Sequence, residues 1–426
     1  MTPSAVTLIL TCLLTALPVM AGAQESGPVP VTLDASRESA RKLLDEYVRA
    51  ALAKSPSLES LRARQASARE MVAPAGALPD PMVGVMYQSI GKPWQPMAPM
   101  SMVQAEISQP IPGVGKRQAR RDAAQAEADT RRVELSATRS RIAAEVRQTF
   151  TQIYALDKEE QALESADDLF TVMLGAVSAR YVTGGADQEA LAKADVERSR
   201  LKEQLLDIHV NRAILVARLN RLAARSQDAV VLRLDTLPEV PLEIGSTSNE
   251  RLENAPELQV QRAVIHAAQR RCDSAEAETR PNFLVGFAGG ATTGGDPVIV
   301  LRIGMELPIW RSSKQEPMVR AARNDTEAAE ADYRAANLKI HEEVAALKGR
   351  FKRDQGQIAL YREEIIPKST FALQAARSAY TLGRADFSTV VEDYRLWLDA
   401  QIGLAKREAD LLATWSELQA ILTPVD

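Results

Sequence analysis

Two stretches of the chain repeat apolar residues in alternating steps of four and three, the spacing of helices that pack side by side as coiled coils. The first repeat runs from Ile142 to Tyr181 and the second from Ile340 to Ile365. This pattern predicts very long helices over about 116–180 and 314–379. At ~1.5 Å per residue, about 65 helical residues reach roughly 100 Å, which is longer than a compact domain needs.

A second pattern alternates apolar and polar residues, and it predicts strands. Between Ile299 and Leu307, every second residue is apolar. Strands are expected over about 80–90, 101–110, 282–290 and 297–308. Strands of this length with one apolar and one polar face fit a membrane β-barrel, and the polar residues expected in the barrel interior are Gln104, Glu106, Arg302 and Glu306. An ordinary half-buried antiparallel sheet shows the same alternation and remains an alternative.

Sequence matches at one spacing indicate that the chain is a duplicated half. Residues 108–111 recur at 306–309, and residues 181–187 recur at 380–386. Each half is expected to hold a helix, a β-hairpin, a very long helix, a turn and a further helix. The expected units are a first repeat over 37–223 with outer helices about 37–72 and 187–223, an inter-repeat belt over 224–246 with strand-like alternation at 230–234, and a second repeat over 247–422 with outer helices about 247–279 and 386–422.

The N-terminus has the features of an export signal. An apolar run from Ala5 to Leu17 precedes the small residues 21–23, so the prediction is a signal peptide over 1–23 and a linker over 24–36. A short membrane anchor is the alternative, but roughly 15 apolar residues fall short of the ~20 that span a bilayer. Cleavage would leave Cys272 as the single cysteine, which excludes an internal disulfide.

Composition narrows the function classes. Aromatic residues make up 4% and charged residues 25% of the chain, which is typical of long helices rather than of a thick globular core. The net charge is −4, and no basic run with interleaved aromatics predicts a nucleic-acid partner. The three histidines lie far apart in the sequence, so no catalytic site, metal site or cofactor is predicted. The chain is not expected to be an enzyme.

Several of these motifs together resemble the outer-membrane factor family typified by TolC. The motifs are the paired Tyr-x-x-Gly turns at Tyr181 and Tyr380, the helix starts at Pro56 and Pro256, and the segment 365–367. The resemblance implies a homotrimer in the outer membrane of a Gram-negative bacterium. Each subunit would give four strands to a barrel of about 12 strands and its helices to an α-helical tunnel across the periplasm.

The function implied by the resemblance is a passive exit duct in a tripartite efflux pump. Its partners would be outer-membrane lipid, a periplasmic adaptor (a membrane fusion protein) and an inner-membrane RND-type pump. A barrel shared by several subunits also agrees with the strand count, because four strands cannot close a barrel alone and an open sheet edge is not stable in lipid. Two alternatives from other classes are a soluble periplasmic coiled-coil adaptor and a structural stalk.

The resemblance also implies which residues form the functional sites. The periplasmic tip, where adaptors dock in this family, would comprise Tyr181, Gly184, Asp187, Tyr380, Gly383 and Asp386. Glycines suit the two chain reversals, and the two aspartates suit N-caps of the returning helices. The family narrows its tunnel just after the second turn, where the gate candidates are Thr389, Glu392 and Asp393. A ring of carboxylates would favour cations, whereas a solvated helix face or an inter-helix salt bridge is the alternative.

Within the family, two segments are most similar to members paired with heavy-metal resistance pumps, the CzcC and CusC type. They are Pro79-Asp80-Pro81 and the stretch from Ser108 to Arg117. This similarity implies heavy-metal cations as the transported solute. Drugs or other small molecules remain the alternative cargo.

Overall fold

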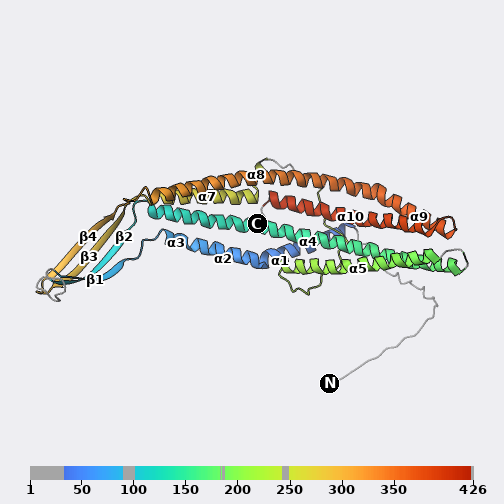
Figure 1. The fold of residues 1–426 in the computed structure, drawn as a ribbon, viewed down its shortest axis with the longest axis horizontal. Helices are drawn as coiled ribbons and strands as arrows, with labels where there is room; N and C mark the ends of the chain where they lie inside the picture. Colours follow the sequence, from blue (N-terminus) through green and yellow to red (C-terminus); the bar gives the residue numbers. More distant parts are fainter. Residues whose placement is uncertain (1–32, 90–100, 183, 185–187, 242–248, 424–426) are drawn as a thin grey trace, which may run out of the picture.

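The helices of the protein form one elongated bundle, and a β-sheet extends from one end of it (Figure 1). The computed structural model describes residues 33–89, 101–182, 184, 188–241 and 249–423. The expected signal peptide, residues 24–32 of the expected linker, residues 242–246 of the expected belt, and Asp187 all lie outside the described residues. At the end opposite to the sheet, two helical hairpins lie together and form what is called the tip below.

The first half contains five helices among its described residues. They are α1 (Leu33–Lys54), α2 (Pro56–Glu70), α3 (Val72–Ala75), α4 (Lys116–Val182) and α5 (Gln188–Leu222). Helix α4 spans the whole of the expected long helix. The apolar positions of its four–three repeat, such as Val146 and Ile153, are buried. The expected linker is too long at its C-terminal end, because α1 already begins at Leu33.

The second half follows the same order. Its helices are α6 (Asn249–Glu253), α7 (Pro256–Ala277), α8 (Gln315–Leu360), a π-helical turn η1 (Tyr361–Ile365), α9 (Ile366–Thr381) and α10 (Phe387–Leu422). No described helix is both long and apolar enough to cross a membrane.

Prolines divide the expected helices 37–72 and 247–279, so the prediction of single helices there is wrong. Ser55 and Ala255 have extended ψ angles of 122° and 135°, and each is followed by a proline in the first turn of the next helix. Proline has no backbone N–H and disfavours the helical conformation of the residue before it. A helix therefore ends at this point in each half, and a new one starts with the proline.

The expected helix 314–379 is also not uniform, because it contains the π-helical turn η1. Here Tyr361 lies against Gly403 of α10 so closely that a Cβ atom on this glycine would be 2.6 Å from the tyrosine hydroxyl. Any larger residue at position 403 would displace the Tyr361 ring. The π-helical turn and the glycine together set the contact between α8 and α10 at this level.

The sheet has four antiparallel strands in the order β1-β2-β3-β4. Their bounds are β1 (Met82–Gln88), β2 (Met102–Ile111), β3 (Asn282–Thr292) and β4 (Pro297–Glu306). The central pair β2 and β3 joins the two halves of the duplication, with Ile107 opposite Phe287. Strands β1 and β4 are the edges, so each has one side with no strand beside it within the described chain.

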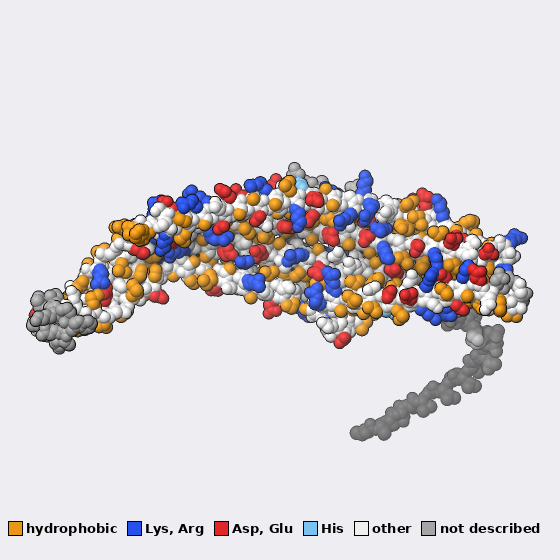
Figure 2. Space-filling model, in the orientation of Figure 1, with side chains coloured by type: hydrophobic (Ala, Val, Ile, Leu, Met, Phe, Trp, Pro, Cys, Tyr) orange, Lys and Arg blue, Asp and Glu red, His pale blue; other side chains and the backbone are white. Residues whose placement is uncertain are grey.

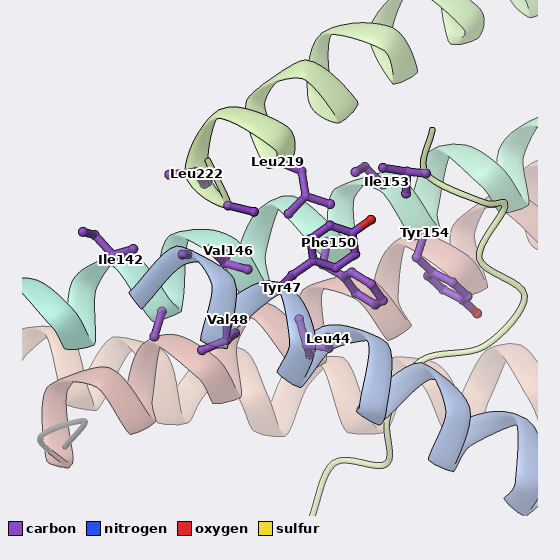
Figure 3. Close-up of a cluster of buried hydrophobic side chains, with 14 of the residues drawn as sticks. Leu44, Tyr47, Val48, Ile142, Val146, Phe150, Ile153, Tyr154, Leu219 and Leu222 are labelled. Atoms are coloured by element: carbon purple, nitrogen blue, oxygen red, sulfur yellow. The ribbon is translucent and has the colours of Figure 1, made fainter. Parts of the chain in front are cut away.

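Buried side chains form three hydrophobic clusters along the bundle. Figure 3 shows the first, in which Leu44, Tyr47 and Val48 of α1 pack on α4 and on the end of α5. The ring centroids of Tyr47 and Phe150 are 6.4 Å apart. A second cluster lies toward the tip, between α4, α5, α9 and α10. The core is therefore a row of small clusters, as the low aromatic content suggests.

The described part of the inter-repeat belt, 224–241, contains no strand, so the alternation at 230–234 is misleading as a strand signal. Val231 and Leu234 are buried, but side chains satisfy the backbone instead of a neighbouring strand. The Leu234 amide donates to the Asp157 carboxylate at 2.8 Å. Arg212 donates to the Val231 carbonyl at 3.1 Å. Ion-pairing residues of α4 and α5 thus hold the belt against the first cluster.

Candidate functional site

At the tip, glycines reverse the chain between antiparallel helices. Gly184 and Gly383 both have a φ of +73°, a conformation that other residues rarely adopt. In each turn the glycine amide donates to the carbonyl of the tyrosine three residues earlier, at 3.0 Å. The structure therefore brings Tyr181, Gly184, Tyr380 and Gly383 to one end of the molecule (Figure 1).

The two tyrosines of the tip have different surroundings. Tyr181 is 45% exposed, whereas Tyr380 is 5% exposed. Arg180, the residue before Tyr181, donates to the Tyr380 carbonyl at 2.5 Å, and its guanidinium lies 4.8 Å from the centre of the Tyr380 ring. Burial raises the pKa of the Tyr380 phenol, which Arg180 partly offsets. Arg180 therefore ties the first hairpin to the second.

Aromatic residues fill the space between the hairpins. The Tyr380 ring meets the Phe387 ring edge to face at 5.8 Å, and Phe170 of α4 meets Tyr394 of α10 in the same way at 4.6 Å. Burial also raises the pKa of Tyr394, so this phenol stays neutral. Such edge-to-face contacts add to the apolar burial that holds the tip together.

Asp386 occupies the N-cap position of α10, but its side chain makes no capping hydrogen bond to the helix. Its carbonyl instead accepts from the Thr389 amide at 3.2 Å. The expected N-cap role of this side chain is therefore wrong in the described conformation. Its carboxylate is exposed at the tip surface.

The three gate candidates lie on the first two turns of α10. Thr389 and Glu392 are exposed, and Asp393 is half-buried. The buried face of α10 at this level contains Val390, Val391 and Tyr394, so Glu392 lies on the opposite face. Among the described residues, the carboxylates of Glu392 and Asp393 have no ion-pair partner. Within the part of the chain that the structure describes, these two positions therefore form no inter-helix salt bridge.

The strand residues expected in a barrel interior share one face of the sheet. The register places Glu106 of β2 opposite Ala288 and Arg302 of β4 opposite Gly286, so the two charged side chains flank β3 on that face. Arg302 donates to the Glu106 carboxylate at 2.6 Å across Gly286, whose missing side chain leaves room for the pair. Gln104 is buried and contacts Met86, while Glu306 accepts from Asn282 at 2.9 Å.

The opposite face of the sheet is apolar and exposed. Figure 2 shows hydrophobic side chains over the strands, in contrast to the mixed charges along the helices. The exposed apolar residues on this face are Val83, Val85, Tyr87, Val103, Ile107, Phe283, Val285, Phe287, Ile299, Leu301, Ile303 and Met305. A contiguous apolar surface of this kind marks contact with another protein or with a membrane.

Sequence reasoning missed the residues that fasten the site. Arg180 is one of them, and the only signal for it in the sequence is that the matching position of the second half holds Ala379. Glu106 and Arg302 were both expected in the barrel interior, but the register of the strands is needed to show that they pair with each other. The described residues contain no cluster of His, Cys, Asp or Glu that could hold a metal ion.

Comparison with known proteins gives matches over most of the chain. A family described as outer membrane efflux protein matches residues 47–225 and 247–423. The cobalt-zinc-cadmium resistance protein CzcC of Cupriavidus metallidurans is 20% identical over 302 residues, which cover 70% of this chain and 71% of CzcC.

Solved structures share the fold. The outer membrane protein VceC of Vibrio cholerae superimposes with a TM-score of 0.76 at 18% identity, over 91% of this chain and 98% of VceC. The channel OprN gives a TM-score of 0.80 at 16% identity, over 90% of each chain. CusC gives 0.77 at 14% identity, over 90% of this chain and 92% of CusC. With both halves of the duplication matched by one family, the chain belongs to the outer membrane efflux protein family.

Proposed function

We propose that three copies of this chain form a passive exit duct across the periplasm and the outer membrane. The observation that carries the proposal is the four-stranded sheet with an apolar outer face, a polar inner face and two open edges. Unpaired strand edges are not stable in lipid, and closing a barrel removes them. Three such sheets supply about 12 strands, a number within the range of membrane barrels.

The helices suit the periplasmic part of such a duct. The 67 residues of α4 correspond to roughly 100 Å at ~1.5 Å per residue. A soluble adaptor or a stalk would need the long helices but has no use for an exposed apolar sheet face. The duct would perform no chemistry, and energy would come from an inner-membrane RND-type pump joined through a periplasmic adaptor. The adaptor would dock at the tip, where Tyr181 is exposed.

The proposed cargo is heavy-metal cations. Support comes from the resemblance to CzcC, whose name describes cobalt, zinc and cadmium resistance. A second support is Glu392, which is exposed and opposite to the buried face of α10. In a trimer, three such carboxylates would form a ring that favours cations at the narrow end of the tunnel. Drugs or other small molecules are the competing cargo.

Gel mobility of outer-membrane extracts tests the assembly. The chain is expected in the outer-membrane fraction as a detergent-resistant trimer that becomes a monomer on heating, and chemical crosslinking should stop at three subunits. A monomer or dimer in the soluble periplasm would contradict the duct and favour the adaptor.

Two measurements test the cargo and the gate. Deletion of the gene in its own host should lower tolerance to Co²⁺, Zn²⁺ and Cd²⁺ and leave tolerance to hydrophobic dyes unchanged; the reverse result would favour drugs. In planar bilayers, Glu392→Gln should reduce the cation preference measured from reversal potentials. Glu203→Gln, which removes an exposed carboxylate of α5, is the matched control and should leave the preference unchanged.

A further inference from the structure

A buried lysine joins the two halves of the duplication where the sheet meets the bundle. Lys116, the first residue of α4, is 2% exposed. Its Nζ donates to the Asn282 side-chain oxygen at 2.7 Å and lies 3.3 Å from a carboxylate oxygen of Glu278. Asn282 begins β3, so this contact connects the long helix of one half with the strand of the other. These buried polar contacts hold the start of α4 against the second half of the chain.

The duplication places the same pair of positions elsewhere in the chain. Lys314 corresponds to Lys116, because Pro308-Ile309 precedes it by the same number of residues as Pro110-Ile111 precedes Lys116. Asp80 corresponds to Asn282, because Pro79-Asp80 stands before Val83-Gly84 as Pro281-Asn282 stands before Val285-Gly286. Both Asp80 and Lys314 are exposed. Among the described residues, neither side chain has a partner.

The order of the helices explains why Asp80 and Lys314 do not meet each other within the described chain. Near the sheet, α2, α4, α7 and α8 lie side by side in this order (Figure 1), and α4 packs against both α2 and α7. The far flank of α8 has no corresponding neighbour among the described residues. On that helix Leu338 is 71% exposed, whereas Ser140, its counterpart on α4, is 1% exposed. Within the chain, α7 packs against the flank of α4. In the same way, α2 and α3 of a second copy would pack against the open flank of α8.

We propose that Lys314 forms an ion pair with Asp80 of the partner subunit, at each contact between subunits of the duct. The proposal rests on the proposed trimer and adds to it the residues that fasten neighbouring subunits at the level where sheet and bundle meet. Position 282 holds an amide, and position 80 holds a carboxylate. A carboxylate neutralises the lysine charge by itself, so the contact between subunits needs no second acidic residue of the kind that Glu278 supplies within the chain.

The loops that precede Lys116 and Lys314 differ in sequence. This difference favours a lysine–carboxylate pair between subunits. A Cβ atom on Gly113 would be 2.1 Å from the Pro281 carbonyl oxygen, so this loop touches the next half closely. The corresponding residues in the second half are Arg311 and Ser313, in place of Gly113 and Gly115. Side chains at these positions would prevent an approach as close as that of Gly113 to Pro281, so the neighbouring subunit would lie further away than the next half of the same chain does. A flexible lysine and a full negative charge suit this wider gap better than an amide does.

Charge reversal tests the pair. Asp80→Lys and Lys314→Asp are each expected to lower the temperature at which the detergent-resistant trimer dissociates, by roughly 5 °C or more. The double variant Asp80→Lys/Lys314→Asp restores the pair with its charges exchanged and should recover most of the loss. Asp296→Lys reverses an exposed charge in the turn between β3 and β4 and should leave the temperature unchanged. Single variants without effect, or a double variant no better than the worse single one, would overturn the pairing.

Cysteine crosslinking separates this inference from the proposed trimer. With Cys12→Ser and Cys272→Ser as background, Asp80→Cys/Lys314→Cys should be joined between chains by a short thiol crosslinker and give dimers and trimers on denaturing gels. The control Asp296→Cys/Lys314→Cys should stay monomeric. If the wild-type protein is a trimer but the first pair does not crosslink, the pairing is wrong and the duct stands. If the wild-type protein is not a trimer, the duct itself is wrong.

Discussion

At the tip, the hairpin between α4 and α5 and the hairpin between α9 and α10 turn through glycines with the same φ, but their tyrosines differ. Tyr380 is enclosed by Phe387 and Arg180, and Tyr181 stands at the surface beside the exposed Val182. The duplication thus preserved the backbone requirement and changed the side-chain role. Both hairpins contribute buried side chains to the core of the tip, and the hairpin between α9 and α10 supplies the enclosed tyrosine. The hairpin between α4 and α5 supplies the arginine that ties the two hairpins together and the exposed Tyr181.

Truncation of each tyrosine tests most directly whether the two side chains contribute differently to the stability of the tip. Tyr380→Ala removes a buried ring and should cost about 3–5 kcal/mol of local stability, whereas Tyr181→Ala should cost less than about 0.5 kcal/mol. Hydrogen exchange followed by mass spectrometry should show amides of residues 376–391 exchanging at least ~100-fold faster in the first variant. Equal exchange in the two variants would mean that the hairpins are anchored alike.

Removal of the tie between the hairpins should have an intermediate effect. Arg180→Met keeps much of the side-chain length but loses the hydrogen bond to the Tyr380 carbonyl and the stacking on its ring, at a cost of about 2 kcal/mol. Exchange should speed up in the second hairpin although the substitution lies in the first. Arg384→Met, which changes an exposed arginine of the second turn, is the control and should have little effect. Faster exchange in the first hairpin alone would contradict the tie.

The glycines should respond equally in both hairpins. Gly184→Ala and Gly383→Ala each force a side chain into the left-handed region, which costs about 1 kcal/mol. Gly175→Ala, at an open position within α4, should have the opposite sign because alanine favours the helix. Thermal unfolding of the helices by circular dichroism, compared across the three variants, checks both signs. A clear difference between the two turn variants would show that their backbones are not equivalent.

The smallest effect should come from removing a hydroxyl. The Tyr380 hydroxyl is buried and has no hydrogen-bond partner among the described residues. Tyr380→Phe should therefore leave the tip unchanged or slightly more stable, because a buried hydroxyl without a partner contributes nothing favourable. Tyr181→Phe should be neutral for the different reason that its side chain is exposed. Faster exchange in Tyr380→Phe would show that the hydroxyl has a partner in the assembled protein.

The sequence was sufficient for features that depend on period and repetition. The four–three spacing around Val146 and Ile153 and the recurrence of the Tyr-x-x-Gly turns indicated long helices and two chain reversals. Features that depend on contacts between distant segments could not be read in this way. Arg180 acts on a residue 200 positions away. The alternation around Val231 resembles that of a strand, but side chains such as Asp157, rather than a neighbouring strand, bind the backbone there. The breaks at Pro56 and Pro256 depend only on local sequence, because proline disfavours the helical conformation of the residue before it.

The π-helical turn between α8 and α9 lies where the spacing between matching residues of the two halves changes. Between Lys314 and this turn, residues of the second half match those of the first at a separation of 198, as for Lys116 and Lys314; after it the separation is 199, as for Tyr181 and Tyr380. One added residue would rotate the rest of an α-helix by ~100° and turn its apolar stripe away from the core. A wide turn accommodates that residue locally. A single-codon insertion after the duplication would thus have been absorbed at Tyr361–Ile365, and the tip kept its orientation.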